Sequence, residues 1–148
     1  MTGEDAPGLN APSVGRPARV IEVASWVHIV EHRLLVVRPL GVDVWFLPGG
    51  LVDPGETPAM TAAREATEEV GVVIDPETLK LLAVVEAEAY GRPETSMRIS
   101  CFIGPATGQP TPLDEIEVLD YIGASERSAC APAVRTVIDL LCDRRLVG

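Results

Sequence analysis

The sequence predicts a layered α/β domain, in which a β-sheet packs against helices. Three observations support this prediction. The chain has 148 residues, of which 47% are hydrophobic, and this is enough to form one domain with a core. Residues that favour β-strands gather in several short segments. Two other segments, 58–70 and 133–144, have the spacing of amphipathic helices, and strands and helices that share a core form layers.

The predicted strands alternate with turns and loops along the chain. In chain order they cover residues 20–30, 34–37, 44–47, 72–74, 79–89, 97–103 and 118–122. Residues 31–33 are expected to form a hairpin tip, 90–96 a polar loop and 104–112 a long loop rich in Gly and Pro. Residues 1–18 are predicted to be a flexible tail, because proline and glycine interrupt them, and residues 19–148 to be the folded domain.

The helix over residues 58–70 has clear signals at both ends. Thr57 is a typical N-cap, Pro58 suits the first helical position, and Gly71 suits the position just past the end. No glycine interrupts the segment between them. Its buried face is predicted to consist of small apolar residues, namely Ala59, Ala62, Ala63, Ala66 and Val70.

Three glutamates share another face of this helix. Glu65, Glu68 and Glu69 have the spacing i, i+3 and i+4, which places their side chains together. Like charges at this spacing repel each other by about a few tenths of a kcal/mol per pair. Three like charges on one face of a helix therefore indicate a bound cation. Oxygen ligands favour Mg²⁺ or Mn²⁺, and Mg²⁺ commonly binds together with the phosphates of a substrate.

The residues around this face complete a predicted metal–diphosphate site. Glu56, on the loop before the helix, can approach the same face. Arg64 lies four residues before Glu68 and can form an ion pair with it. Gly49 and Gly50 let the backbone come close to a ligand.

Residues 50–72 resemble the Nudix box, written G-x5-E-x7-R-E-U-x-E-E-x-G-U, where U is a large aliphatic residue. Its fixed positions are filled here by Gly50, Glu56, Arg64, Glu65, Glu68, Glu69 and Gly71. Val72 fills the second U position, and Ala66 fills the first, where a larger aliphatic residue is commoner. The order of elements extends the resemblance to most of residues 19–145. It implies the Nudix α/β/α sandwich, with a mixed β-sheet between helices.

The resemblance implies hydrolysis, dependent on Mg²⁺ or Mn²⁺, of a diphosphate linkage in a nucleoside diphosphate derivative or a nucleoside triphosphate. Metal ions held by carboxylates lower the pKa of a bound water and stabilise charge on phosphoryl oxygens. Two alternatives remain open. One is a catalytically silent nucleotide-binding or sensing module of the same fold. The other is an isomerase of prenyl diphosphates, which requires a catalytic cysteine and an altered box.

The resemblance also assigns roles to individual residues. The implied metal ligands are Glu65, Glu69, Glu68, Glu56 (a ligand or an orienting residue) and the carbonyl of Gly49. The implied catalytic residues are Glu68, Glu115 and Arg64, of which Arg64 ties the loop to the helix. Glu115 is favoured as the general base, because family members often use a glutamate from the loop before the last core strand. Asp114 and Glu117 are the alternatives in that loop.

Substrate contacts are predicted for Arg38, Arg98 and Tyr90. Arginine binds phosphate through paired hydrogen bonds, which favours Arg38 and Arg98 as phosphate contacts. Tyr90 stands where some subfamilies that cleave dinucleoside polyphosphates carry a tyrosine. Aromatic residues make up only 4% of the chain, so Trp26, Trp45 and Phe102 are expected to pack in the core rather than on a base.

Composition excludes several other classes of protein. A net charge of −10 argues against binding to duplex nucleic acid, but is compatible with small anionic substrates if metal ions supply positive charge. Three cysteines match no zinc-binding spacing and are expected to be reduced thiols. No apolar run is long enough to cross a membrane, and no signal-peptide core is present. We therefore expect a cytoplasmic protein, and the resemblance makes a homodimer a candidate assembly.

Overall fold

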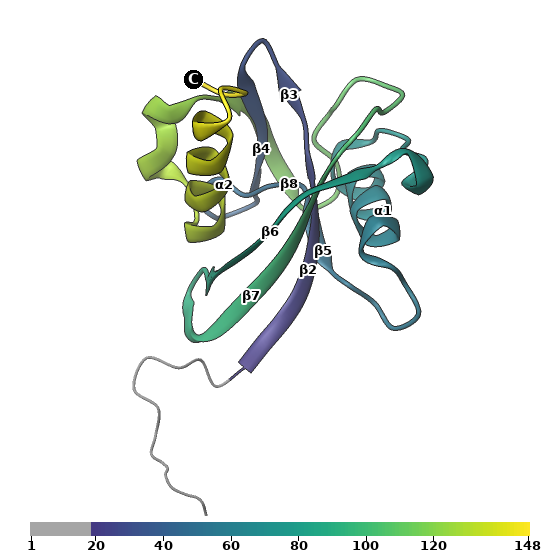
Figure 1. Ribbon diagram of the computed structural model, residues 1–148, viewed down its shortest axis with the longest axis horizontal. Helices are drawn as coiled ribbons and strands as arrows, with labels where there is room; N and C mark the ends of the chain where they lie inside the picture. Colours follow the sequence, from purple (N-terminus) through teal and green to yellow (C-terminus); the bar gives the residue numbers. More distant parts are fainter. Residues whose placement is uncertain (1–18) are drawn as a thin grey trace, which may run out of the picture.

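Two β-sheets separate the two main helices in the computed structural model, which describes residues 19–148 (Figure 1). The first sheet has the strand order β5 (Gly49–Leu51), β2 (Arg19–Val27), β7 (Arg92–Ile103) and β6 (Lys80–Ala89). It is mixed, because β2 and β7 are parallel and the other pairs are antiparallel. The second sheet is antiparallel, with the order β3 (Ile29–Val30), β4 (Arg33–Pro39) and β8 (Ile116–Ile122).

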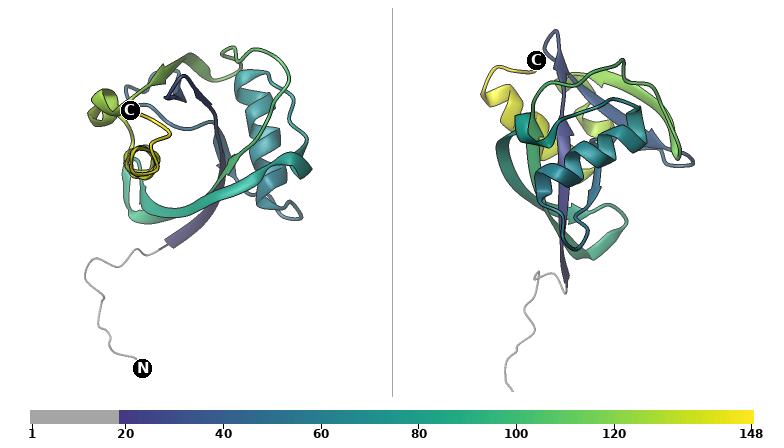
Figure 2. Two further views of the ribbon diagram at one scale, coloured as in Figure 1. Left: turned by 45° about the horizontal axis from the view of Figure 1, so that its top comes forward. Right: turned by 90° about the vertical axis from the view of Figure 1, so that its right-hand side faces the viewer.

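The helices α1 (Pro58–Val70) and α2 (Pro132–Asp143) lie on opposite sides of the strands in all three views (Figures 1 and 2). Two short 3₁₀ helices, η1 (Pro76–Thr78) and η2 (Ala124–Ala129), complete the fold. The predicted α/β/α sandwich is therefore confirmed, with the first helix as bounded in the sequence. The flexible tail predicted for residues 1–18 lies outside the described residues. No helix between residues 19 and 148 is long and apolar enough to span a membrane.

Alternation along β2 and β7 divides the core between the two helices. Trp26 is fully buried in the cluster that packs under α1, whereas its neighbour Val27 is fully buried in the cluster that packs under α2. On β7, Ile99 and Cys101 face α2, and Phe102 faces the small residues of α1. Successive residues of β2 and β7 therefore lie on opposite faces of the first sheet, one face packed against α1 and the other against α2. The three cysteines are free thiols, as expected.

The strand predicted at 44–47 is wrong, because only isolated bridges occur at Trp45 and Phe46. The regular strand is β5, which begins at Gly49 and pairs antiparallel with β2. A Cβ atom on Gly49 would lie 2.4 Å from the carbonyl oxygen of Ala24, so this pairing requires glycine. A strand made of glycines has none of the side chains that identify strands in a sequence.

Two other predicted boundaries also differ from the structure. Residues 72–74 do not form a strand: only Val73 makes a bridge, to Thr107. The predicted loop at 90–96 is also wrong, because β6 and β7 are joined by a tight turn at Tyr90 and Gly91, where Gly91 has a φ of 74°. Residues 90–96 are polar because this part of the β6–β7 hairpin extends into solvent, and not because they form a loop.

Candidate functional site

The ends of α1 fix the position of its acidic face. The hydroxyl oxygen of Thr57 accepts a hydrogen bond from the Met60 amide at 3.2 Å and caps the first turn. Gly71 adopts the left-handed conformation and its amide donates to the carbonyl of Thr67, which ends the helix. Ala62 in between is fully buried, so α1 packs closely on the first sheet.

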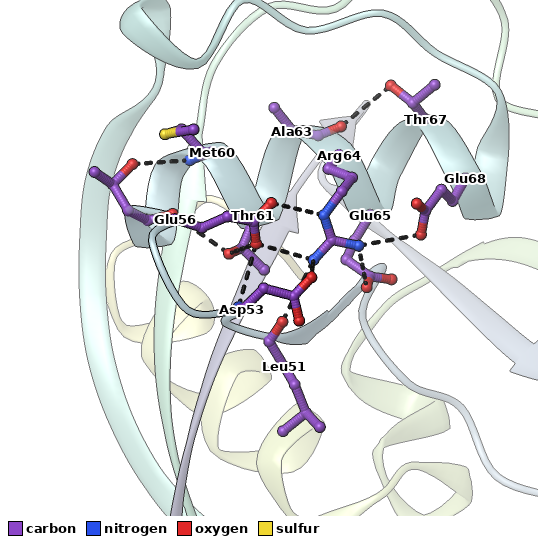
Figure 3. Close-up of polar contacts among 11 residues, drawn as sticks. Leu51, Asp53, Glu56, Met60, Thr61, Ala63, Arg64, Glu65, Thr67 and Glu68 are labelled. Atoms are coloured by element: carbon purple, nitrogen blue, oxygen red, sulfur yellow. Dashed lines mark hydrogen bonds and ion pairs between the residues drawn. The ribbon is translucent and has the colours of Figure 1, made fainter.

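Arg64 is the centre of a network of carboxylates (Figure 3). Its Nε and Nη2 atoms donate to the two carboxylate oxygens of Glu56, at 2.7 and 3.0 Å. Its Nη1 atom donates to Glu65 at 3.0 Å and to Glu68 at 3.3 Å. Asp53 forms a further ion pair with Nη2 at 3.3 Å. One guanidinium group thus holds the loop before α1 and two glutamates of the acidic face in fixed positions.

Glu56 is fully engaged within the protein. The paired hydrogen bonds from Arg64 and the hydrogen bond from the Thr61 hydroxyl at 2.7 Å lower the pKa of Glu56 to about 2. In return, the hydrogen bonds with Glu56 raise the pKa of Arg64 above its ordinary value. Both oxygens of Glu56 accept hydrogen bonds, so this geometry favours the orienting role over the metal-ligand role.

The carboxyl groups of Glu65 and Glu69 lie against adjacent glycines of β5, Glu65 at Gly50 and Glu69 at Gly49. Burial, followed by the nearby charge of Glu65, raises the pKa of Glu69 to about 8. Burial also raises the pKa of Glu65. An oxygen of Glu69 accepts a hydrogen bond from the Gly49 amide at 3.3 Å. Two partly buried carboxylates side by side are disfavoured unless a proton or a cation lies between them.

This pair suits a magnesium ion that is completed by a substrate. In residues 19–148, no three side chains from His, Cys, Asp and Glu already surround one point. Mg²⁺ is usually held by one or two carboxylates, and waters and substrate phosphates fill its other positions. Glu65 and Glu69 provide the carboxylates for such an arrangement.

Gly50 makes room for the Glu65 carboxylate. A Cβ atom at position 50 would lie 2.5 Å from both Cδ and one oxygen of Glu65. The carboxylate therefore lies directly against the backbone of β5. The close neighbours of these two glycines lie within the protein, Ala24 for Gly49 and Glu65 for Gly50, and the approach of their backbone to a ligand stays a prediction.

A pocket with a volume of about 420 Å³ lies next to the carboxylate pair, and Glu69 lines it together with Gly49 and Gly50. Most of its remaining wall is apolar and comes from β2, β4, β7, the N-terminal part of α2 and residues 46 and 47 before β5. The turn between β6 and β7 adds Tyr90 and Arg92. A largely apolar cavity with a few polar groups is typical of a small-molecule site.

Of the predicted substrate contacts, Tyr90 lines this pocket, and its ring packs edge-on against Phe46 with 5.7 Å between the ring centroids. Arg38 instead lies over the ring of Trp45, with its Cζ atom 4.9 Å from the ring centroid. The residues on either side of Arg38 line the pocket, but Arg38 does not.

Arg98 and Glu115 also lie outside the pocket lining. Arg98 pairs with Glu22 and Glu86 at 3.9 and 3.6 Å across the first sheet, on the face that α1 covers. Glu115 is exposed, and its carbonyl accepts a hydrogen bond from the Leu40 amide. The next residue, Ile116, does line the pocket. The assignment of Glu115 as general base stays a prediction.

Sequence reasoning missed Arg92. Arg92 and Met97 both line the pocket although they lie five residues apart on β7, where regular alternation would place them on opposite faces. A register irregularity in the β6–β7 pairing, between Glu88 and Ala89, accounts for this change of face. Pro93 beside it has no amide hydrogen for the ladder and is the one signal in the sequence.

In the hydrolysis that the resemblance to the Nudix box implies, replacing Arg64 with lysine is expected to lower turnover by about 10- to 100-fold, because losing a residue that orients candidate metal ligands usually has an effect of this size. A lysine has a single ammonium group and cannot hold Glu56, Glu65 and Glu68 together. Steady-state kinetics and thermal unfolding measure the two effects. The control is Arg127→Lys, because Arg127 also makes paired hydrogen bonds to a carboxylate, that of Asp139, at an exposed site. Equal turnover in the two variants would contradict this prediction.

Comparisons with known proteins agree with this geometry. A family model described as the NUDIX domain matches residues 19–129. A Bacillus subtilis protein, provisionally named an 8-oxo-dGTP diphosphatase, is 33% identical over 87 residues, which are 59% of this chain and 54% of that protein. The chain spans less than two-thirds of the length of the curated relatives that it matches.

Two solved structures show the same fold. The MutT NUDIX hydrolase from Burkholderia pseudomallei has a TM-score of 0.66 at 20% identity, covering 81% of this chain and 96% of that one. A bifunctional NMN adenylyltransferase/ADP ribose pyrophosphatase from Francisella tularensis, complexed with AMP and a Mn ion, has a TM-score of 0.62 at 19% identity. The match covers 84% of this chain and 41% of that one.

Proposed function

Because the NUDIX domain model matches most of its length, the chain belongs to the NUDIX family, and we propose that it is a hydrolase dependent on Mg²⁺ or Mn²⁺. Its substrate is a nucleoside diphosphate derivative or a nucleoside triphosphate, cleaved at a diphosphate linkage. The observation that carries the proposal is the pair of carboxyl groups of Glu65 and Glu69 at the edge of a pocket of small-molecule size. The names of the Bacillus relative and of the Francisella structure are both consistent with it.

Each residue of the acidic face has a proposed role. Glu65 and Glu69 hold the metal ion, and Glu68 and the carbonyl of Gly49 are further candidate ligands. The bound ion would lower the pKa of a water and stabilise the charge on the phosphoryl oxygens. Arg64 orients the glutamates through its three sets of hydrogen bonds.

The general base is proposed to be Glu115 or Glu68. Both are exposed acidic residues near the site, since Glu68 belongs to the acidic face and Glu115 comes directly before the pocket residue Ile116. A base must reach the water that it deprotonates. Replacing each residue with glutamine and comparing the dependence of kcat on pH distinguishes them, because loss of the true base also removes the acidic limb of the profile.

Treatment with EDTA followed by dialysis is expected to abolish turnover, and addition of Mg²⁺ or Mn²⁺ is expected to restore it. The reason is that Glu65 and Glu69 supply only negative charge to the site. A negatively charged diphosphate can bind beside them only if a cation neutralises the repulsion. Release of phosphate or pyrophosphate from a panel of nucleotides measures this. Turnover that persists without metal contradicts the proposal. Binding of a nucleotide without turnover by the metal-loaded protein favours the silent binding module instead.

A further inference from the structure

Of the described residues that line the pocket, Arg92 alone carries a positive charge. None of the ion pairs formed within residues 19–148 involves it. Six other arginine and lysine residues of the described chain also form no ion pair, but none of them lines the pocket, so the position of Arg92 is what distinguishes it. Arg64, Arg98 and Arg127, by comparison, each pair with a carboxylate.

A ligand that enters the pocket has to provide acceptors for this arginine. Arg92 is exposed, so its guanidinium group can form hydrogen bonds with water when no ligand is bound. It has five N–H donors in a rigid plane and no acceptor. A ligand that covers it without providing acceptors leaves these donors unpaired, which is costly. The rest of the pocket lining is mainly apolar, so Arg92 is well placed to select among ligands of similar shape.

The surroundings of Arg92 suit a planar, aromatic ligand. Tyr90 and Phe46 pack edge-on and together form an aromatic part of the pocket wall. Glu69, where the proposed function places the diphosphate, lines another part that is contributed by α1. The space between Glu69 and the aromatic wall is available for the base of the substrate. Aromatic rings such as a nucleotide base stack well against tyrosine and phenylalanine side chains.

We propose that Arg92 is a specificity-determining residue that donates paired hydrogen bonds to the base of the substrate and makes the pocket prefer guanine to adenine. Guanine presents two adjacent acceptors, O6 and N7, which match the spacing of two guanidinium donors. Adenine presents N7 beside an amino group, which is a donor and cannot pair with Arg92. This inference rests on the proposed function, because it assigns the base of the nucleotide to this pocket.

Binding of GMP and AMP to the full chain tests the inference without any hydrolysis. Isothermal titration calorimetry in the presence of Mg²⁺ is expected to show that GMP binds about tenfold more tightly than AMP. The Arg92→Met variant keeps an unbranched apolar stem but lacks the guanidinium donors, and it is expected to bind both nucleotides equally. Arg92→Lys is expected to keep only part of the preference, because an ammonium group does not form the paired contact.

Arg145→Met is the matched control. Arg145 is exposed, follows α2 and does not line the pocket, and its replacement changes the net charge by the same amount. It is expected to keep the wild-type preference. Equal binding of GMP and AMP by the wild type, binding of neither, or a preference that survives Arg92→Met would overturn the inference. Hydrolysis of nucleotides is assayed separately, so a protein that selects GMP through Arg92 but cleaves nothing refutes only the proposed function.

Discussion

Replacing Glu69 with glutamine is expected to reduce kcat/KM by about a thousandfold, while the protein stays as stable as the wild type or becomes more stable. A metal ion contributes several kcal/mol of transition-state stabilisation, and each factor of ten corresponds to about 1.4 kcal/mol. Glutamine keeps the size of the side chain and the hydrogen bond from Gly49, but it removes one ligand charge. It also removes a carboxyl group whose pKa is raised first by burial and then by the nearby charge of Glu65, and whose charged form is therefore unfavourable in the folded protein.

The opposite direction of the two effects is what identifies a functional carboxylate. Replacing a residue that is needed only for folding lowers the stability and the activity of the protein together. Kinetics with Mg²⁺ and thermal unfolding of the same samples measure both. The control is Glu77→Gln, which removes one negative charge from the exposed helix η1. If Glu69→Gln retains at least a tenth of wild-type kcat/KM, the metal-ligand role of Glu69 is wrong.

The sequence was sufficient to predict α1 and the direction of its acidic face, because these depend on local interactions. Thr57 caps the helix through a hydrogen bond to a residue three positions away, and Gly71 ends it through its own backbone conformation. Glu65 and Glu69 are one turn apart, so the helix alone brings them together. The paired hydrogen bonds between Arg64 and Glu56 depend instead on the path of the loop before the helix, which these local interactions do not set.

The pocket could not be predicted in the same way, because its wall comes from elements far apart in the chain. Glu69 meets Tyr90 and Arg92 only through the pairing of β5, β2, β7 and β6. Arg92 lines the pocket and Arg98, the residue predicted from the sequence, does not, because the two side chains lie on different faces of β7. A register irregularity sets that face for Arg92, and pairing with Glu22 and Glu86 engages Arg98. Neither feature leaves a periodic pattern in the sequence.

Replacing Gly50 with alanine is expected to reduce turnover by about a hundredfold and to destabilise the protein by about 1–3 kcal/mol, the usual cost of an inserted methyl group in a tightly packed position. The added methyl group would lie 2.5 Å from the carboxyl carbon of Glu65 and would push this group away from Glu69. The backbone of Gly50 does not have a positive φ, so alanine can adopt it without strain. Urea unfolding and Mg²⁺-dependent kinetics measure the two effects.

A double-mutant cycle with Glu65→Ala shows whether this contact is the cause. In the Glu65→Ala background the atoms that the new methyl group would strike are absent. Gly50→Ala should then cost little stability, because the two changes act on one contact and are not additive. If Gly50→Ala lowers the free energy of unfolding equally in both backgrounds, alanine disturbs β5 itself rather than the contact with Glu65. Gly49→Ala is expected to disturb β5 in this way, through the carbonyl of Ala24. A large coupling would instead show that Gly50 is a glycine because Glu65 must lie against it, so that the fold of β5 and the position of a proposed metal ligand depend on the same missing side chain.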